Sequence, residues 1–448
     1  MATLFEDLFT GTAGNSVASR AANSGGSWSK HGSYASGDLI LRTGGGCYPT
    51  GASGIVMVTD NTAVTDVECE VGLDVMTVPG GANQYAAAGV RMSNSSLIWN
   101  TTWMNWPGFD RLGGYDTALA NYTFRLQLSE TPPFAEYPVG QYTLKHTIRG
   151  TLVRTFLDRR EVFRRQSGIA ANGRFGIITG GAATSTTGTH FTHFRATNDF
   201  DTNQIQFVGD SMVRGDYTAD AVPTVLNVGE DVQWPAQTMA LLEAKGFVAD
   251  WANLGVSAQT AQEIDTYANQ TLTTANGIPH RVIDTGTSRG WGSRSCRRTA
   301  ATHDMIVLMA GINDLRAGAS AATVISRLEG LVDDYVADGF TVVGMTIPEC
   351  DEAGDLIPAG FNAAVATINA AILANSDLAG VIDVASDPLL GDYENTTYRS
   401  EFDALHWTPF AQARVASMAY AVMAPLLGIS TGSPAFIGSG FGSFFGDG

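Results

Sequence analysis

Apolar and polar residues alternate through much of the chain before residue 200. In residues 67–75, and again in residues 142–148, every second side chain is apolar or aromatic, and the positions between are acidic, small or polar. This period of two indicates β-strands with one face in the core and the other in solvent. Many short strands separated by glycine-rich turns predict an all-β antiparallel sandwich for residues 1–198.

The apolar spacing changes after residue 200. Residues 305–309 are a continuous apolar run, as in a central parallel strand, whereas residues 324–336 place apolar side chains at helical spacing. The same reasoning predicts strands at 205–208, 341–347 and 381–384, and helices at 361–373 and 408–423. Alternating strands and helices predict an α/β domain over residues 199–429, with a parallel sheet covered on both faces. Residues 430–448 are rich in Gly, Ser and Phe and are expected to form a tail outside the core.

Length and charge limit the partners of this protein. A chain of 448 residues is too long for one ordinary core, so two domains are expected. Its net charge of −18 disfavours nucleic acid and anionic membranes, and no apolar run reaches the length of a membrane span. No signal-peptide pattern follows Met1. We therefore expect a protein that stays in the cell or leaves it by lysis, unless a signal has been removed.

Cysteine is sparse. Cys47, Cys69, Cys296 and Cys350 are expected to be unpaired, with two intradomain disulfides as the alternative. Neither a CxxC nor an HExxH spacing occurs, so the sequence predicts no metal site and no cofactor.

Four separated segments carry the candidate chemistry. Residues 209–211, Gly-Asp-Ser, directly follow the strand predicted at 205–208, at the strand end where parallel sheets build active sites. The others are residues 253–260, residues 311–314 and residues 403–406. Taken alone, a Gly-Asp-Ser triplet is usually a turn, and a single histidine is usually a capping or core residue.

Together these segments hold a nucleophile and a base. Ser211 becomes a good nucleophile only when a base accepts its proton, and His406 is suited to that role. Asp403 lies three residues before His406, where a carboxylate fixes the imidazole tautomer and stabilises the imidazolium.

The order and spacing of the segments resemble the SGNH, or GDSL, hydrolases over residues 203–425. The matching family motifs are GDSxxxG, NxGxSGxT, GxND and DxxH. The resemblance implies a three-layer, flavodoxin-like α/β fold and a serine esterase that needs no cofactor. It also implies that Ser211, Asp403 and His406 are catalytic, and that the oxyanion donors are the backbone N–H groups of Ser211 and Ala258 and the side-chain amide of Asn313.

One position departs from the family pattern, because Ala258 stands where the motif has glycine. We expect a negative φ at Ala258, so that replacement by glycine leaves turnover unchanged. Supporting roles around the site are expected for Gly209, Asp210, Asn253, Gly311 and Asp314.

Residues 277–302 combine five arginines with a tryptophan and many glycines. One interpretation is a lid in which Arg289, Trp291 and Arg294 bind an acidic sugar. The other is a solvated surface loop.

The order of strands in the first half resembles the concanavalin-A-like or laminin-G-like jelly roll, over residues 4–197. A sandwich paired with an SGNH hydrolase implies a glycan substrate, with removal of O-acetyl groups as the reaction. The start at Met1 and the Gly/Phe-rich tail further suggest an oligomeric phage tail fibre or spike, with other virion components as partners. Two alternatives stay open: a glycan-binding attachment protein with an inactive hydrolase fold, and a general carboxylesterase or lipase.

Overall fold

A computed structural model gives the architecture of the chain. The residues it describes are 3–31, 37–50, 55–59, 63–76, 84–92, 100–106, 111–116, 121–127, 140–150, 152–166, 172–180, 183–198, 200, 202–218, 225–227, 232–268, 294, 298, 301–352, 357–400 and 405–430. Asp403, Arg289, Trp291 and Cys296 lie outside these residues, as does nearly all of the predicted tail.

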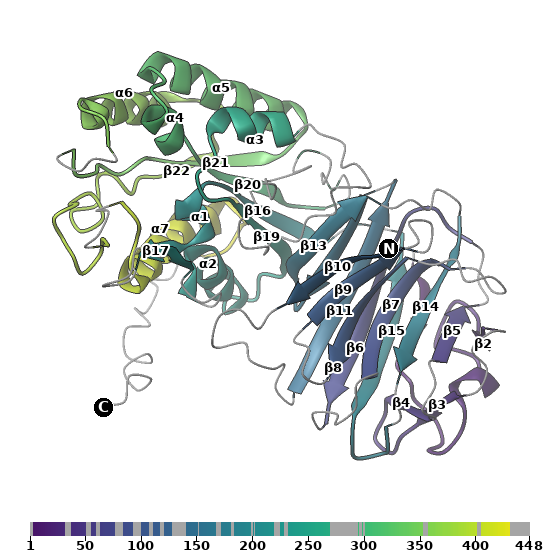
Figure 1. Ribbon diagram of the computed structural model, residues 1–448. Coiled ribbons are helices and arrows are strands. Elements are labelled where there is room, and N and C mark those ends of the chain that lie inside the picture. The colour runs from purple at the N-terminus through teal and green to yellow at the C-terminus, as the bar shows by residue number, and fades with distance from the viewer. Residues whose placement is uncertain are drawn as a thin grey trace, which may run out of the picture. The chain divides into compact units, whose positions relative to one another are not determined.

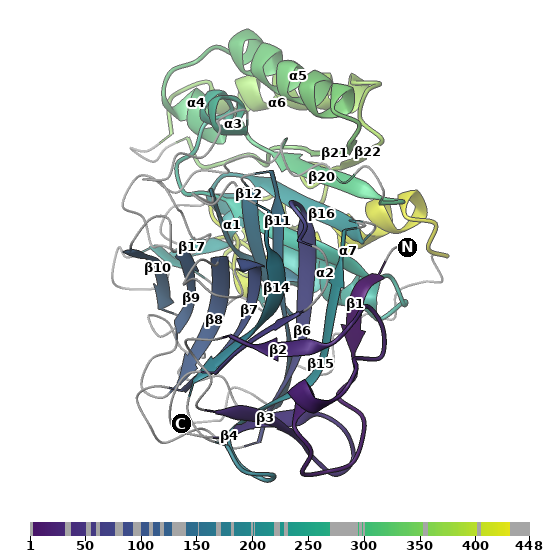
Figure 2. The ribbon, with the colours of Figure 1, turned by 90° about the vertical axis from the view of Figure 1, so that its right-hand side faces the viewer.

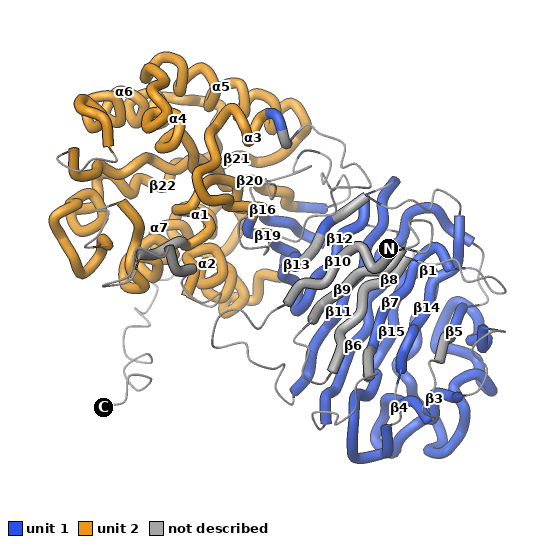
Figure 3. Tube along the Cα trace, viewed as in Figure 1, with its two compact units in different colours: residues 1–205, 249–253, 266–302 blue, residues 206–248, 254–265, 303–448 orange. Residues whose placement is uncertain are grey.

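The chain forms two compact units (Figure 3). Unit 1 contains residues 1–205, 249–253 and 266–302, and unit 2 contains residues 206–248, 254–265 and 303–448. Two segments from the second half of the sequence, residues 249–253 and 266–302, therefore group with the β-rich first half.

Unit 1 is built from two antiparallel sheets, seen from two directions in Figures 1 and 2. The first has the strand order β13-β12-β11-β6-β15-β4-β3, with β1 paired to β15. Its strands are β1 (Thr3–Asp7), β3 (Asp38–Leu41), β4 (Cys47–Thr50), β6 (Val67–Val75), β11 (Gly140–Arg149), β12 (Leu152–Leu157), β13 (Arg160–Gln166) and β15 (Thr189–Thr197).

The second sheet has the order β10-β9-β8-β7-β14-β5-β2. Its strands are β2 (Trp28–Lys30), β5 (Ile55–Thr59), β7 (Gln84–Met92), β8 (Asn100–Trp106), β9 (Arg111–Asp116), β10 (Asn121–Gln127) and β14 (Arg174–Gly180). Buried side chains from both sheets form one core, in which Phe5 packs edge-on against Trp28 and Phe175. This arrangement is consistent with the predicted sandwich, and the jelly-roll connectivity remains a prediction.

Strand β6 shows how far the alternating pattern predicts which side chains are buried. Val67, Val71 and Val75 face the core, as predicted. The opposite, acidic face is not in solvent as expected, since Glu68 is only 6% exposed. The prediction was wrong at this point because a pair of buried cations covers the carboxylates of this face.

Those cations are Lys145 and Arg298, and both belong to unit 1. The Nζ of Lys145 lies 3.1 Å from Glu68 Oε1 and 3.0 Å from Asp250 Oδ2, and Arg298 Nη2 lies 2.8 Å from the same Asp250 oxygen. Burial alone would raise the pKa of Asp250, but Lys145 and Arg298 hold that pKa below its ordinary value. We call Glu68, Lys145, Asp250 and Arg298 the buried ion cluster.

Unit 2 has a sheet in the order β22-β21-β20-β16. Neighbouring pairs β20–β21 and β21–β22 run parallel, with Met305 opposite Thr341 and Val343 opposite Gly380. The strands are β16 (Asn203–Gly209), β20 (Asp304–Met309), β21 (Thr341–Met345) and β22 (Gly380–Ile382). Strand β19 (Ala249–Gly255) is divided, with residues 249–253 in unit 1 and residues 254–255 in unit 2. Strands β17 (Asp216–Thr218) and β18 (Val225–Asn227) form a separate antiparallel pair.

Helices cover both faces of this sheet, so unit 2 has the three layers of an α/β fold. Helices α3 to α6 lie on one face, and α2 and α7 lie together on the other (Figure 1). The helices are α1 (Ser211–Arg214), α2 (Trp234–Glu243), α3 (Ala261–Ala268), α4 (Ile312–Arg316), α5 (Ala321–Ala337), α6 (Phe361–Ala374) and α7 (Pro409–Leu426); a short 3-10 helix, Val17–Ser19, lies in unit 1.

The described cysteines are Cys47, Cys69 and Cys350, and each is a buried free thiol. Burial raises the pKa of Cys47 and Cys69 well above the ordinary value, so both are protonated side chains of the core. None of the helices in the described part of the chain combines the length and apolar content that a bilayer crossing requires.

Candidate active site

A serine and a histidine meet at the end of strand β16. The strand ends at Gly209, and Asp210 then caps helix α1, with its Oδ1 accepting a hydrogen bond from Met212 N at 3.0 Å. Ser211 is the first residue of that helix, and its Oγ lies 2.8 Å from His406 Nε2. The pair is 7% and 8% exposed, so a hydrogen bond joins them in a largely dry environment.

Two motif glycines allow the loops around this pair to approach closely. A Cβ at Gly209 would lie 2.2 Å from the carbonyl oxygen of Met309 on β20. A Cβ at Gly255 would lie 2.2 Å from the backbone nitrogen of Arg214 in α1. Real Cβ atoms do not approach backbone so closely, so any side chain at either position would force these loops apart.

Residues 256–259 form a tight turn beside the serine. The Gln259 N–H donates to Val256 O at 3.2 Å, and the Val256 N–H donates to Gly209 O at 3.1 Å. Ala258, the third residue of the turn, has φ +61°. The expected negative φ is therefore wrong, because Ala258 holds the third position of this turn in the left-handed region, as glycine normally does in a type II turn. For alanine this conformation costs about 1 kcal/mol.

Asn313 joins the third loop to the second. It follows Gly311, whose φ of +116° begins helix α4. Its Nδ2 donates to Gln259 O at 3.1 Å, which uses one of the two amide hydrogens and fixes the plane of the amide. The structure therefore brings Asn313 to the turn that contains Ala258, as the motif order predicted. Their joint role as oxyanion donors remains a prediction.

Asp314 holds the same two loops together. It is fully buried, and its Oδ2 accepts a hydrogen bond from Ala261 N at 2.7 Å. Its Oδ1 lies 2.7 Å from Arg327 Nη1, so the carboxylate also ties helix α5 to the site. The supporting role expected of Asp314 in catalysis stays a prediction. Asn253, on β19, is half-buried.

Two arginines near the site were not singled out from the sequence. Arg327 binds Asp314, and Arg214 Nη1 donates to Ser257 Oγ at 2.9 Å, next to Ala258. Arg214 lies within the longer GDSxxxG motif, three residues after Ser211, and this position indicates that it lies near the nucleophile. Arg327 carries no such signal, since it stands in a long amphipathic helix.

The arginine-rich segment is described only in part. Arg298, in that segment, belongs to the buried ion cluster and donates to Thr202 O at 2.9 Å. Both contacts are to residues of unit 1. Arg294 is half-buried. Substrate binding by Arg289, Trp291 and Arg294 stays a prediction.

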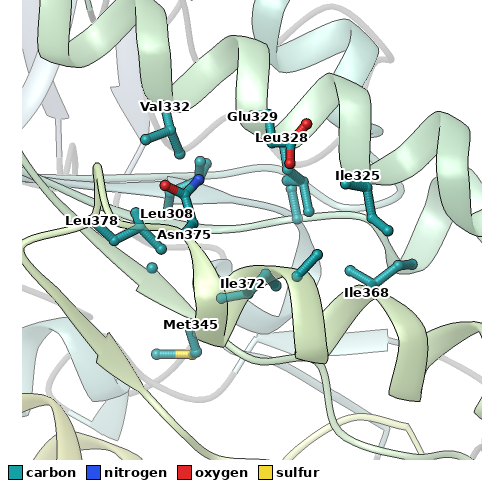
Figure 4. A pocket seen from close by; sticks show the side chains of 13 residues that line it. Leu308, Ile325, Leu328, Glu329, Val332, Met345, Ile368, Ile372, Asn375 and Leu378 are labelled. Carbon is teal, nitrogen blue, oxygen red and sulfur yellow. The ribbon is translucent and has the colours of Figure 1, made fainter.

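A small cavity lies away from the candidate residues, between α5, α6 and the strands beneath them (Figure 4). Its volume is about 30 Å³. Its lining is apolar apart from Glu329 and Asn375, and it includes none of the residues predicted for catalysis. Among the described residues, no group of three His, Cys, Asp or Glu side chains is placed to hold a metal ion.

Residues 207–414 match the sequence profile of the GDSL-like lipase/acylhydrolase family. This segment is a GDSL-type hydrolase domain. The matched residues include Ser211, Ala258, Asn313 and His406, so the hydrolase domain contains the whole described site and also the predicted Asp403.

Solved structures similar to the chain include two esterases. A carbohydrate acetylesterase from Sinorhizobium meliloti is 15% identical, with a TM-score of 0.36, and the match covers 50% of this chain and 99% of that one. An aryl esterase from M. smegmatis is 19% identical, with a TM-score of 0.34, covering 50% and 99%. A carbohydrate-binding module from Bacillus subtilis is 15% identical, with a TM-score of 0.26, covering 38% and 92%. The comparison with curated proteins gave no match.

Proposed function

We propose that this protein is a serine esterase that removes O-acetyl groups from a polysaccharide through an acyl-serine intermediate. The observation that carries the proposal is the 2.8 Å hydrogen bond between Ser211 Oγ and His406 Nε2 inside a GDSL-type hydrolase domain. A serine hydroxyl paired with an imidazole in this way is the arrangement that activates serine for acyl transfer.

The reaction begins when Ser211 Oγ attacks the ester carbonyl carbon and its proton passes to His406 Nε2. The carbonyl oxygen becomes an oxyanion, for which the proposed donors are the N–H groups of Ser211 and Ala258 and the amide of Asn313. Donors that are already oriented stabilise this charge at little cost in reorganisation. The donor turn and Asn313 are tied to each other through Gln259 O, which supports that arrangement.

The tetrahedral intermediate then collapses. The bond between the carbonyl carbon and the alcohol oxygen breaks, and the alcohol leaves with the proton from His406 Nε2. Water attacks the acyl-serine, gives its proton to His406, and the acid is released as Ser211 recovers its hydrogen. Asp403, by the family motif, accepts a hydrogen bond from the other imidazole nitrogen.

A glycan substrate is the finer part of the proposal. It is supported by analogy of architecture, since a two-sheet β unit accompanies the hydrolase domain. The predicted contacts from Arg289, Trp291 and Arg294 belong to the same proposal, as do homo-oligomerisation and a place on a virion tail.

Release of acetate from a panel of acetylated polysaccharides tests this function directly. Wild-type protein should release acetate from at least one glycan, and Ser211→Ala should release none from the same glycan. Hydrolysis of p-nitrophenyl acetate without acetate release from any glycan would keep the esterase and reject the glycan substrate. An inactive wild type that still binds a glycan would favour the attachment-protein alternative.

A further inference from the structure

The backbone around His406 pairs with a neighbouring segment, residues 398–400. Arg399 pairs with Trp407 as an antiparallel bridge. The Ser400 N–H donates to His406 O at 2.9 Å, and the Thr408 N–H donates to Tyr398 O at 3.2 Å. Residues 398–400 therefore run beside residues 406–408.

The side chain of Arg399 makes a second connection to the segment that contains His406. It is fully buried. Its Nη1 donates to Leu405 O at 2.6 Å, its Nη2 to Leu390 O at 2.6 Å and to Glu349 O at 3.2 Å, and its Nε to Leu390 O at 3.1 Å. Three carbonyl groups from three separate segments thus converge on one planar guanidinium.

The contact with Leu405 O bears on catalysis because that carbonyl belongs to the peptide group joining Leu405 to His406. A bond to this carbonyl fixes the orientation of the peptide plane, and with it the direction in which the imidazole leaves the backbone. Arginine suits this task, since its donors form a rigid fork that spans several acceptors at once. Lysine offers all its donors from a single point.

We propose that Arg399 is a positioning residue that holds the His406 imidazole within hydrogen-bonding distance of Ser211. The inference rests on the proposed esterase function. Displacement of a reacting group by about 1 Å costs on the order of a hundredfold in rate, so loss of this clamp acts on turnover more than on substrate binding.

The test compares Arg399→Lys with Arg414→Lys in the full-length protein. Arg414 is the control, because its guanidinium is held by two contacts of 2.7 Å to the carboxylate of Asp387 and, in the described part of the chain, by no hydrogen bond or ion pair to residues 405–408. Both proteins are first checked by near-ultraviolet circular dichroism at the assay temperature, and kcat and KM are then measured with p-nitrophenyl acetate. We expect Arg399→Lys to lower kcat about ten- to hundredfold with KM changed less than about twofold, and Arg414→Lys to retain wild-type kcat.

Chemical rescue supplies a readout that a purely structural role would not give. In Arg399→Ala, millimolar guanidinium should partly restore kcat by occupying the vacated space, and urea at the same concentration should not. Neither compound should restore Ser211→Ala. Folded Arg399→Lys with wild-type kcat, or a rise in KM alone, would overturn the inference.

Two further outcomes are also decisive. If neither Arg399 variant is folded, Arg399 is needed for the fold as a whole and the positioning role is rejected. If Ser211→Ala keeps full activity, the proposed function fails, whereas an inactive Ser211→Ala beside a fully active, folded Arg399→Lys rejects only the role of Arg399.

Discussion

The side-chain amide of Asn313 donates to the backbone oxygen of Gln259 across 3.1 Å. This bond leaves the second amide hydrogen for another acceptor and holds the amide beside the turn of Ala258. A donor fixed in this way is ready before the charge it would stabilise develops, which is the condition for efficient electrostatic catalysis.

Removal of the Asn313 amide should therefore lower turnover more than substrate binding. We expect Asn313→Ala to reduce kcat about a hundred- to thousandfold with little change in KM, measured with p-nitrophenyl acetate. The control is Asn369→Ala, which removes a comparable buried amide bonded to Ile347 N and Ile347 O at 2.8 and 2.7 Å. That variant should lose stability and keep its turnover. Unchanged kcat in Asn313→Ala would remove Asn313 from the oxyanion hole.

Replacement of Ala258 by glycine should stabilise the protein, because the φ of Ala258 is positive and not negative as the sequence led us to expect. Glycine adopts the observed φ of +61° without strain, so the free energy of unfolding should rise by about 1 kcal/mol, and turnover should not fall. Ala370→Gly, on the exposed face of α6, should instead lower the free energy of unfolding by about 1 kcal/mol. Denaturant titration of both variants measures the opposite signs, and a loss of stability in Ala258→Gly would contradict the positive φ.

Loss of the nucleophile or of its base should abolish catalysis and preserve the fold. Ser211→Ala and His406→Ala should each reduce kcat by about ten-thousandfold or more, and Asp403→Asn somewhat less. Turnover of p-nitrophenyl acetate measures the loss of catalysis, and circular dichroism checks that the fold is preserved. Retention of most activity in Ser211→Ala would refute the catalytic assignment.

The buried ion cluster should make unit 1 sensitive to acid. The pKa of Asp250 is lower in the folded protein than in the unfolded chain, so its contribution to stability is complete above the ordinary aspartate range. That contribution is lost as the pH falls through the depressed pKa of the folded state, that is, below about pH 4. Lys145→Met should remove a cation from beside buried carboxylates, destabilise unit 1 by about 3–5 kcal/mol and bring acid unfolding to higher pH. Equal acid midpoints for wild type and Lys145→Met would contradict this role of the cluster.

The hydrolase domain should fold without the first half of the chain. A fragment beginning near Asn198 keeps Arg298 beside Asp250, so the carboxylate retains one of its two cations. We expect a soluble fragment that cleaves p-nitrophenyl acetate, and loss of solubility when Arg298→Met is added to it. An unfolded parent fragment beside a stable full-length protein would show that the two parts depend on each other for folding.

The sequence predicted the regular elements of unit 2 closely because their cores depend on local periodicity. Apolar spacing predicted a helix over residues 324–336, and α5 occupies Ala321–Ala337, with Ser320 as its cap. The predicted strand at 305–309 is β20, Asp304–Met309. Motif order likewise predicted that Ser211 and His406 meet, although 195 positions separate them.

Features set by contacts between distant residues escaped prediction. The acidic face of β6 was expected in solvent because Lys145 and Arg298, the partners of Glu68, lie far from it in the sequence. The positive φ of Ala258 was not predicted because an alanine, unlike a glycine, does not indicate a left-handed backbone conformation. Arg399 carries no motif, and only its three carbonyl acceptors reveal its place in the site.

The buried ion cluster also restricts which sequences can replace the first half of the protein. Glu68 and Lys145 come from that half, whereas Asp250 and Arg298 come from segments of the second half that group with it in unit 1. Each half contributes one carboxylate and one cation. Lys145 pairs with Asp250, and Arg298 pairs with Glu68, so each carboxylate has a cation from the other half beside it. Replacement of the first half by an unrelated sequence would leave Asp250 with one cation fewer, so the new sequence would have to supply a cation in the place of Lys145 to give that carboxylate its second partner.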